Sequence, residues 1–367
     1  MVMFDQADLR ELAAFGDEVG VLSFYTTMEP GTQAGRTRLR NEIAALRQEL
    51  SADPDHERAR LVGLRLDLLE PRIDELLDPA GPGLGRALFA QVAGEEVRTK
   101  WVQLPVGDLA MLREHAYLLP LITAVQADRP AGVARVGRDG VRLFDCRYGL
   151  ADELEPINFR LATAGGSAEG SKTLPGLSRG GIHPDRFDQR VEEHLTKFLR
   201  ESAPHVAGQA RQLGWETLLL VGDPRDTSVL SEALPAGTEI IQVDAVLDPA
   251  LSPPEVLEFV RPALDEARAR HDAALAVHAR DLALSGGNGA VGLDDILSLL
   301  RQGRVEHLLL DDAGGWKAAP PKPVAPEDLE EEMIELALEH GGEVTVLESG
   351  AAGELAEAGG VAAMLRW

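Results

Sequence analysis

A glycine-rich stretch with a few basic side chains is the part of this sequence best suited to chemistry. Between Ala162 and Gly181 the chain holds six glycines with Ser, Thr, Lys and Arg, and almost no apolar residue. Such a stretch has no core to join, so we expect it to be mobile. Glycine adopts backbone shapes closed to other residues, and Lys172 or Arg179 could contact phosphate. The stretch could therefore enter a narrow cavity lined by RNA.

The stretch ends on Gly180, Gly181, Ile182 and His183, and Pro184 follows. Proline suits the first position of a helix, where its missing N–H would have no partner, so we predict a helix from there. Ile182 carries no polar side-chain atom. His183 could act as a base, but a residue at a helix start is the better interpretation. We therefore expect no catalytic residue and no enzyme activity at this point.

Other motifs do not suggest a cofactor or a metal. The segment Gly165–Thr173 partly matches a phosphate-binding loop, but Ser171 separates the glycine from the lysine that this motif needs adjacent. The histidines at 271, 278 and 307 lack metal-ligand spacing, and Cys146 is the only cysteine. We expect neither a cofactor nor a metal site.

The elements that would position the loop follow an α/β pattern. A buried strand is expected at 19–25, and two helices with apolar stripes follow, one through Leu39 and Ile43 and one through Leu61, Leu64 and Leu68. A β-hairpin around Arg138-Asp139-Gly140 opens the middle of the chain. The last part alternates helix, strand, helix and strand. We predict three α/β domains: an N-terminal domain at 1–128, a mixed-sheet domain bearing the loop at 129–270, and an α/β/α domain at 271–367.

The charge is unevenly distributed along the chain. The net charge is -25, which argues against general nucleic-acid affinity and against DNA as a partner. Residues 129–213 nevertheless hold 13 basic and 11 acidic side chains, whereas residues 271–367 hold 6 and 18. Any RNA contact should therefore fall in the middle, and the last part should face a protein. Asp5 and Asp8 do not suit a signal peptide, and no apolar run is long enough for a membrane span, so we expect a cytoplasmic protein.

The end of the chain resembles one known family. Gly359 and Gly360 precede an apolar strand and then Arg366 and Trp367, as in archaeal and eukaryotic class-I release factors and Pelota. Residues 290–310 are similar to that family's third domain, which has an L30e-like fold. The order of hairpin, glycine-rich loop and long helix also matches. In release factors the loop carries Gly-Gly-Gln, and the matching positions here are Gly180, Gly181 and Ile182.

The resemblance implies a factor that binds the ribosomal A site. Its RNA-binding loop would comprise Lys172, Arg179, Gly180, Gly181, Ile182 and His183. The partners would be the ribosomal RNA of the A site and of the peptidyl transferase centre, and a translational GTPase such as EF-Tu. Ile182 in place of glutamine favours a Balon-type hibernation factor that protects idle ribosomes. The alternatives are a rescue factor or peptidyl-tRNA hydrolase, and an adaptor protein with no ribosomal role.

Overall fold

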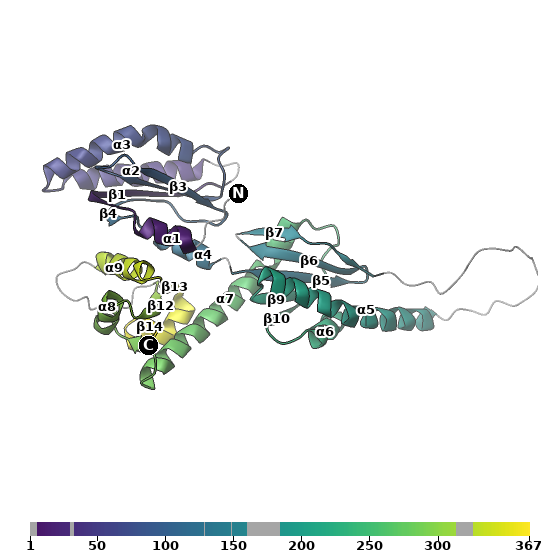
Figure 1. Ribbon diagram of the computed structural model, residues 1–367. Coiled ribbons are helices and arrows are strands. Elements are labelled where there is room, and N and C mark those ends of the chain that lie inside the picture. Colours follow the sequence, from purple (N-terminus) through teal and green to yellow (C-terminus); the bar gives the residue numbers. More distant parts are fainter. Residues whose placement is uncertain (1–5, 30–32, 128, 148, 160–183, 313–325) are drawn as a thin grey trace, which may run out of the picture. The chain divides into compact units, whose positions relative to one another are not determined.

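The chain folds into two compact units, described here from a computed structural model (Figure 1). One unit combines Met1–Asp128 with Asp265–Trp367, and the other is Arg129–Leu264. The three-domain division expected from the sequence stays a prediction. The structure describes residues 6–29, 33–127, 129–147, 149–159, 184–312 and 326–367.

The N-terminal part of the first unit is built on an antiparallel sheet. Two long helices cover one face of this sheet, and two short helices lie on the other (Figure 1). The strands, in the order β3-β2-β1-β4, are β1 (Gly16–Thr27), β2 (Gly85–Gln91), β3 (Val97–Val102) and β4 (Leu109–His115). The helices are α1 (Gln6–Ala13), α2 (Ala34–Ser51), α3 (His56–Leu76) and α4 (Leu119–Gln126).

The predicted apolar stripe is confirmed on α2 and wrong on α3. Leu39 and Ile43 are buried against the sheet. On α3, however, Leu64 is 50% exposed and Leu68 is 71% exposed. The helix buries a neighbouring face instead, because a second apolar row fits the sheet better. That row consists of Val62, Leu66, Leu69, Ile73 and Leu76.

The C-terminal part of the first unit is an α/β/α layer structure, as predicted. Its sheet has the order β11-β14-β12-β13, with helices α8 and α9 on one face and α7, α10 and η2 on the other. The strands are β11 (Gly289–Val291), β12 (Val305–Asp311), β13 (Glu343–Leu347) and β14 (Val361–Leu365). The helices are α7 (Pro253–Leu284), α8 (Leu293–Arg301), α9 (Pro326–Glu339), α10 (Ser349–Ala352) and η2 (Gly353–Ala358).

The two ends of the chain share one hydrophobic core. Leu12 and Ile122 from the N-terminal part belong to the same buried cluster as Met333 and Val346 from the C-terminal part. At the rim of this core Gln126, at the end of α4, binds the edge strand β13. Its side-chain amide donates to the Val344 carbonyl and accepts the Val346 N–H at 3.0 Å. These contacts join the two ends of the chain within one compact unit.

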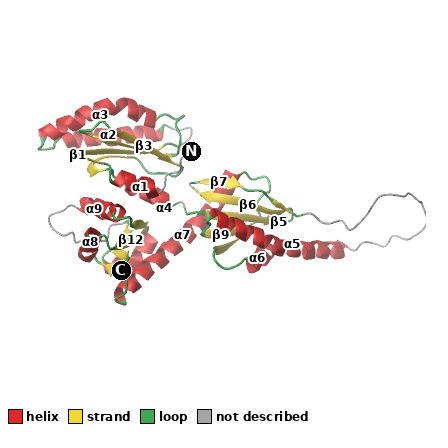
Figure 2. Ribbon diagram, in the orientation of Figure 1, coloured by secondary structure: helices red, strands yellow, loops and turns green. Residues whose placement is uncertain are grey.

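The second unit is a mixed sheet covered by helices on both faces, which confirms the predicted α/β class (Figure 2). The strand order is β10-β9-β5-β6-β7, and β8 also pairs with β6. The strands are β5 (Ala131–Gly137), β6 (Gly140–Arg147), β7 (Leu150–Glu153), β8 (Ile157–Asn158), β9 (Thr217–Gly222) and β10 (Glu239–Asp244). The helices are α5 (Pro184–Leu213) and α6 (Pro224–Ala233), together with the first part of α7.

Strand β9 shows why helices pack on both faces of this sheet. Its successive side chains point to opposite faces of the sheet. Leu218 and Leu220 pack with α5 and α6, while Leu219 and Val221 pack with α7. A strand that is apolar on both faces is typical of the parallel part of a sheet, and β9 pairs in parallel with both β5 and β10.

Candidate functional site

The predicted loop residues lie outside the part of the chain that the structure describes. The structure instead defines the framework from which the loop starts and to which it returns. The residues concerned are Lys172, Arg179, Gly180, Gly181, Ile182 and His183.

The chain that leads into the loop is held against the β5–β6 hairpin. The hairpin turn at Arg138-Asp139-Gly140 is present as predicted. Gly140 has a φ of +132°, and a side chain there would collide with the Ile157 carbonyl, so glycine is needed for β8 to lie against the turn. The Phe159 N–H then donates to the Asp139 carbonyl at 2.9 Å. The last described residue before the loop is therefore held beside the hairpin turn.

The return point is the predicted helix that starts at Pro184. The rings of Phe159 and Phe198 are in contact, with centroids 5.2 Å apart. Leu195 and Leu199 on either side of Phe198 are buried, which fixes this part of α5 on the sheet. At 1.5 Å per residue, Pro184 lies about 21 Å from Phe198 along the helix axis. The two attachment points are therefore well separated, and α5 extends past the place where the chain leaves the sheet.

Charged side chains surround this loop-bearing end of the sheet. Strands β5 and β9 run in parallel with Arg135 opposite Val221, so the turn after β5 and the start of α6 lie at the same end. The exposed residues Arg138 and Arg225 follow the two strands there. They are far apart in sequence; the sequence pattern identified Arg138 only as part of a hairpin turn and did not identify Arg225.

One carboxyl group at this end has a shifted pKa. Burial raises the pKa of Asp226, and the neighbouring carboxylates of Asp223 and Glu192 raise it further, while Arg138 and Arg225 oppose the shift. Asp226 is therefore within electrostatic range of both arginines and of the other two acids. Glu192 lies on α5, so the helix that follows the loop also reaches this end of the sheet.

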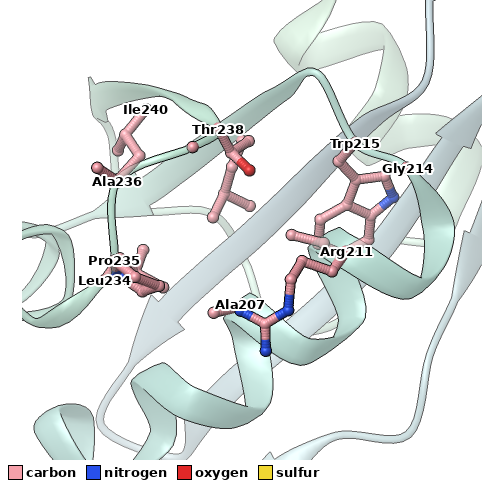
Figure 3. A pocket seen from close by; sticks show the side chains of 12 residues that line it. Ala207, Arg211, Gly214, Trp215, Leu234, Pro235, Ala236, Thr238 and Ile240 are labelled. Atoms are coloured by element: carbon pink, nitrogen blue, oxygen red, sulfur yellow. The ribbon is translucent and has the colours of Figure 1, made fainter.

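A cavity lies at the opposite end of the same sheet. Its volume is about 300 Å³, and it opens between the end of α5 and the connection from α6 to β10 (Figure 3). Trp215 forms one wall, and its ring nitrogen donates to the Asp145 carboxylate at 2.6 Å. Arg211 alone is charged among the described residues that line the cavity. The lining is otherwise mostly small and apolar, so we assign no chemistry to it.

Two features are absent from the described residues. No group of three or more His, Cys, Asp or Glu side chains in those ranges could hold a metal ion. Across the same part of the chain, no helix is both long and apolar enough to cross a lipid bilayer.

Comparison with known families identifies the loop-bearing segment. Residues 117–264 match the family model described as bacterial archaeo-eukaryotic release factor family 10. The matched segment belongs to the archaeo-eukaryotic release-factor family. The resemblance expected from the chain's end and its loop is confirmed in this segment, which includes the hairpin, the loop and α5. Assignment to the Balon-type branch stays a prediction.

Solved structures of this family are also similar to the chain. An archaeal translation termination factor, aRF1, is 18% identical, with 99% of each chain covered and a TM-score of 0.27. Pelota from Archaeoglobus fulgidus is 16% identical, with 77% of this chain and 79% of that chain covered and a TM-score of 0.43. A ribosome-bound archaeal Pelota is 14% identical, with coverages of 99% and 94% and a TM-score of 0.41. A search of curated proteins finds no match.

Proposed function

We propose that this protein binds the ribosomal A site of idle ribosomes and protects their active centres as a hibernation factor. The observation that carries the proposal is the family match over the segment that holds the glycine-rich loop, with Ile182 at the position of the release-factor glutamine. The archaeal Pelota among the similar structures is described as ribosome-bound, which supports a ribosomal partner here. The proposed location is the cytoplasm, where ribosomes work.

The chemistry of the loop favours binding over hydrolysis. Cleavage of a peptidyl ester requires a positioned water and a donor to the developing oxyanion. An isoleucine side chain supplies neither. Glycines beside a basic residue can still thread between RNA strands and contact phosphate through Arg179 and Lys172. The proposed loop therefore occupies the peptidyl transferase centre without releasing peptide.

The acidic end of the chain favours a protein partner. Residues 271–367 hold 6 basic and 18 acidic side chains, which repel ribosomal RNA. We propose that this part contacts a ribosomal protein or a translational GTPase such as EF-Tu, whereas the N-terminal part lies toward the decoding site.

Co-sedimentation with salt-washed bacterial ribosomes tests the proposal. We expect the protein to pellet with vacant ribosomes and to stay in the supernatant when tRNA fills the A site. Binding that is insensitive to A-site tRNA would contradict the proposed site. No binding near physiological salt, with or without a translational GTPase, would favour the adaptor alternative.

A release assay separates the hibernation factor from a rescue factor or a peptidyl-tRNA hydrolase. Labelled peptide should remain on stalled complexes when this protein is added, because Ile182 cannot position a water. Release that disappears in a Gly181→Ala variant would show that the loop hydrolyses peptidyl-tRNA through its backbone, and the hibernation proposal would then be wrong.

A further inference from the structure

Of the nine arginines in the Arg129–Leu264 unit whose side chains the structure describes, five are held in ion pairs and four are not. In each pair a guanidinium nitrogen lies 2.6 to 3.3 Å from a carboxylate oxygen. The pairs are Arg129–Glu216, Arg135–Asp139, Arg142–Glu153, Arg147–Asp145 and Arg261–Glu258. Among the described side chains of the unit, Arg138, Arg200, Arg211 and Arg225 form no such pair, and all four are exposed.

Two of these four arginines lie at the loop-bearing end of the sheet. Because Arg135 lies opposite Val221, Arg138 beyond β5 and Arg225 beyond β9 extend from neighbouring strand ends. Both arginines lower the pKa of Asp226, which agrees with this placement. Arg211 precedes β9 and therefore lies at the other end of the same strand.

The nearest carboxylates are already engaged or lie apart. Asp139 forms an ion pair at 3.0 Å with Arg135, whose side chain is 6% exposed. Asp223 caps α6 by accepting the Arg225 N–H at 2.9 Å. Asp226 is within electrostatic reach of both guanidinium groups, yet no ion pair of 4.0 Å or less joins it to either among the described contacts. Both guanidinium groups therefore keep their donors for an external acceptor.

We propose that Arg138 and Arg225 together bind RNA backbone phosphate at the base of the glycine-rich loop. A guanidinium group offers a planar set of donors that fits phosphate oxygens. Phe159, the last described residue before the loop, is hydrogen-bonded to Asp139 next to Arg138, so RNA that receives the loop would pass these two side chains. This proposal depends on the ribosome binding proposed above. It adds a contact to the RNA backbone that does not depend on the RNA sequence and that positions the loop.

Salt dependence of ribosome binding tests this site. Each phosphate contact contributes a slope of roughly 0.7–0.9 to the plot of log K against log salt. We expect the Arg138→Gln, Arg225→Gln double variant to bind salt-washed ribosomes more weakly at low salt. Over a fourfold rise in salt its affinity should fall about tenfold less than that of the unaltered chain.

Matched variants control for charge and folding. Arg211→Gln removes an exposed, unpaired arginine at the other end of the sheet, so its slope should equal that of the unaltered chain, whereas Arg225→Gln alone should lower the slope. Asp226→Asn removes a competing carboxylate and should tighten binding. Melting temperatures of the arginine variants should stay close to that of the unaltered chain, because the side chains of these arginines are exposed.

The outcomes separate this site from the proposed function. If the unaltered chain does not bind ribosomes, the proposed function and this site fall together. If it binds while the double variant keeps the full slope, only the site is wrong. Weaker binding with an unchanged slope would indicate an acidic protein surface as the partner, and it would also overturn the assignment to phosphate.

Discussion

Gln126 offers a sharp test of how the two ends of the chain are joined. Its amide donates to the Val344 carbonyl and accepts the Val346 N–H, so it satisfies two backbone groups of the edge strand β13. Val344 is 8% exposed and Val346 is 7% exposed, so water has little access to either. Gln126→Glu keeps the shape and the acceptor but removes the donor, which isolates half of this interaction.

The expected loss of stability follows from that missing donor. A buried carbonyl left without a partner costs about 1–3 kcal/mol. A negative charge at the end of α4 adds about 0.3–1 kcal/mol, because the carbonyl end of a helix repels it. A stronger bond from Val346 to the carboxylate offsets part of this. We therefore expect Gln126→Glu to destabilise the protein by about 2 kcal/mol at pH 7.

The loss should disappear at low pH. A protonated glutamate regains a donor for the Val344 carbonyl, so folding raises the pKa of the introduced carboxyl. Such a group costs little below its ordinary pKa of about 4.3, and the penalty grows as pH rises through the folded pKa. The measurements are thermal unfolding between pH 4 and 7 and hydrogen exchange of the β13 peptide. Thr123→Ala, an exposed change on the same helix, should stay within about 0.5 kcal/mol of the unaltered chain. Unchanged stability and unchanged exchange for Gln126→Glu at pH 7 would refute the role of this side chain.

Two further predictions concern the half-buried Glu335 and the buried Gly132. Burial raises the pKa of Glu335, against the opposing effect of His115 at 2.9 Å, so the stability of the unaltered chain should fall as pH rises from about 4.5 through the folded pKa. Glu335→Gln should flatten that part of the melting-temperature profile, and an unchanged slope would show that this carboxyl is not responsible. Gly132→Ala should cost about 1–3 kcal/mol or more in denaturant unfolding, because its methyl group would overlap the Trp215 ring. Gly208→Ala, in open space on α5, should instead raise stability by about 0.5–1 kcal/mol, and equal effects of the two changes would contradict this packing.

Local patterns predicted most of the elements but not always the face that each one buries. The α2 stripe through Leu39 was correct because that helix has a single apolar row. Helix α3 has two rows of leucines, one through Leu64 and Leu68 and one through Leu66 and Leu69, so its spacing fits either face. Only the shape of the sheet beneath it decides between them. Element α1 was missed because eight residues carry too little periodicity.

Contacts distant in sequence could not be derived from such patterns. The hairpin at 138–140 and the helix from Pro184 were predicted from turn and proline signals, and both frame the loop as expected. The neighbourhood of Arg138 and Arg225 depends on β5 pairing in parallel with β9, which no local signal specifies. The shared core of the two chain ends has the same origin, because an amphipathic pattern identifies an apolar face without identifying its partner.

The charge distribution makes the loop-bearing end the place where we expect the proposed RNA affinity to arise. A chain with a net charge of -25 is repelled by RNA at long range, so attraction has to come from a few local contacts. Ion pairing within the Arg129–Leu264 unit engages five of its nine described arginines, and two of the four that remain, Arg138 and Arg225, lie at the end of the sheet where the described chain stops at Phe159. A small number of phosphate contacts gives a shallow dependence of ribosome binding on salt. A protein with roughly 6–10 phosphate contacts loses affinity steeply instead, because each contact adds a slope of roughly 0.9. Such a steep loss would contradict this reasoning, because it would require a basic surface that this unit does not present among its described residues.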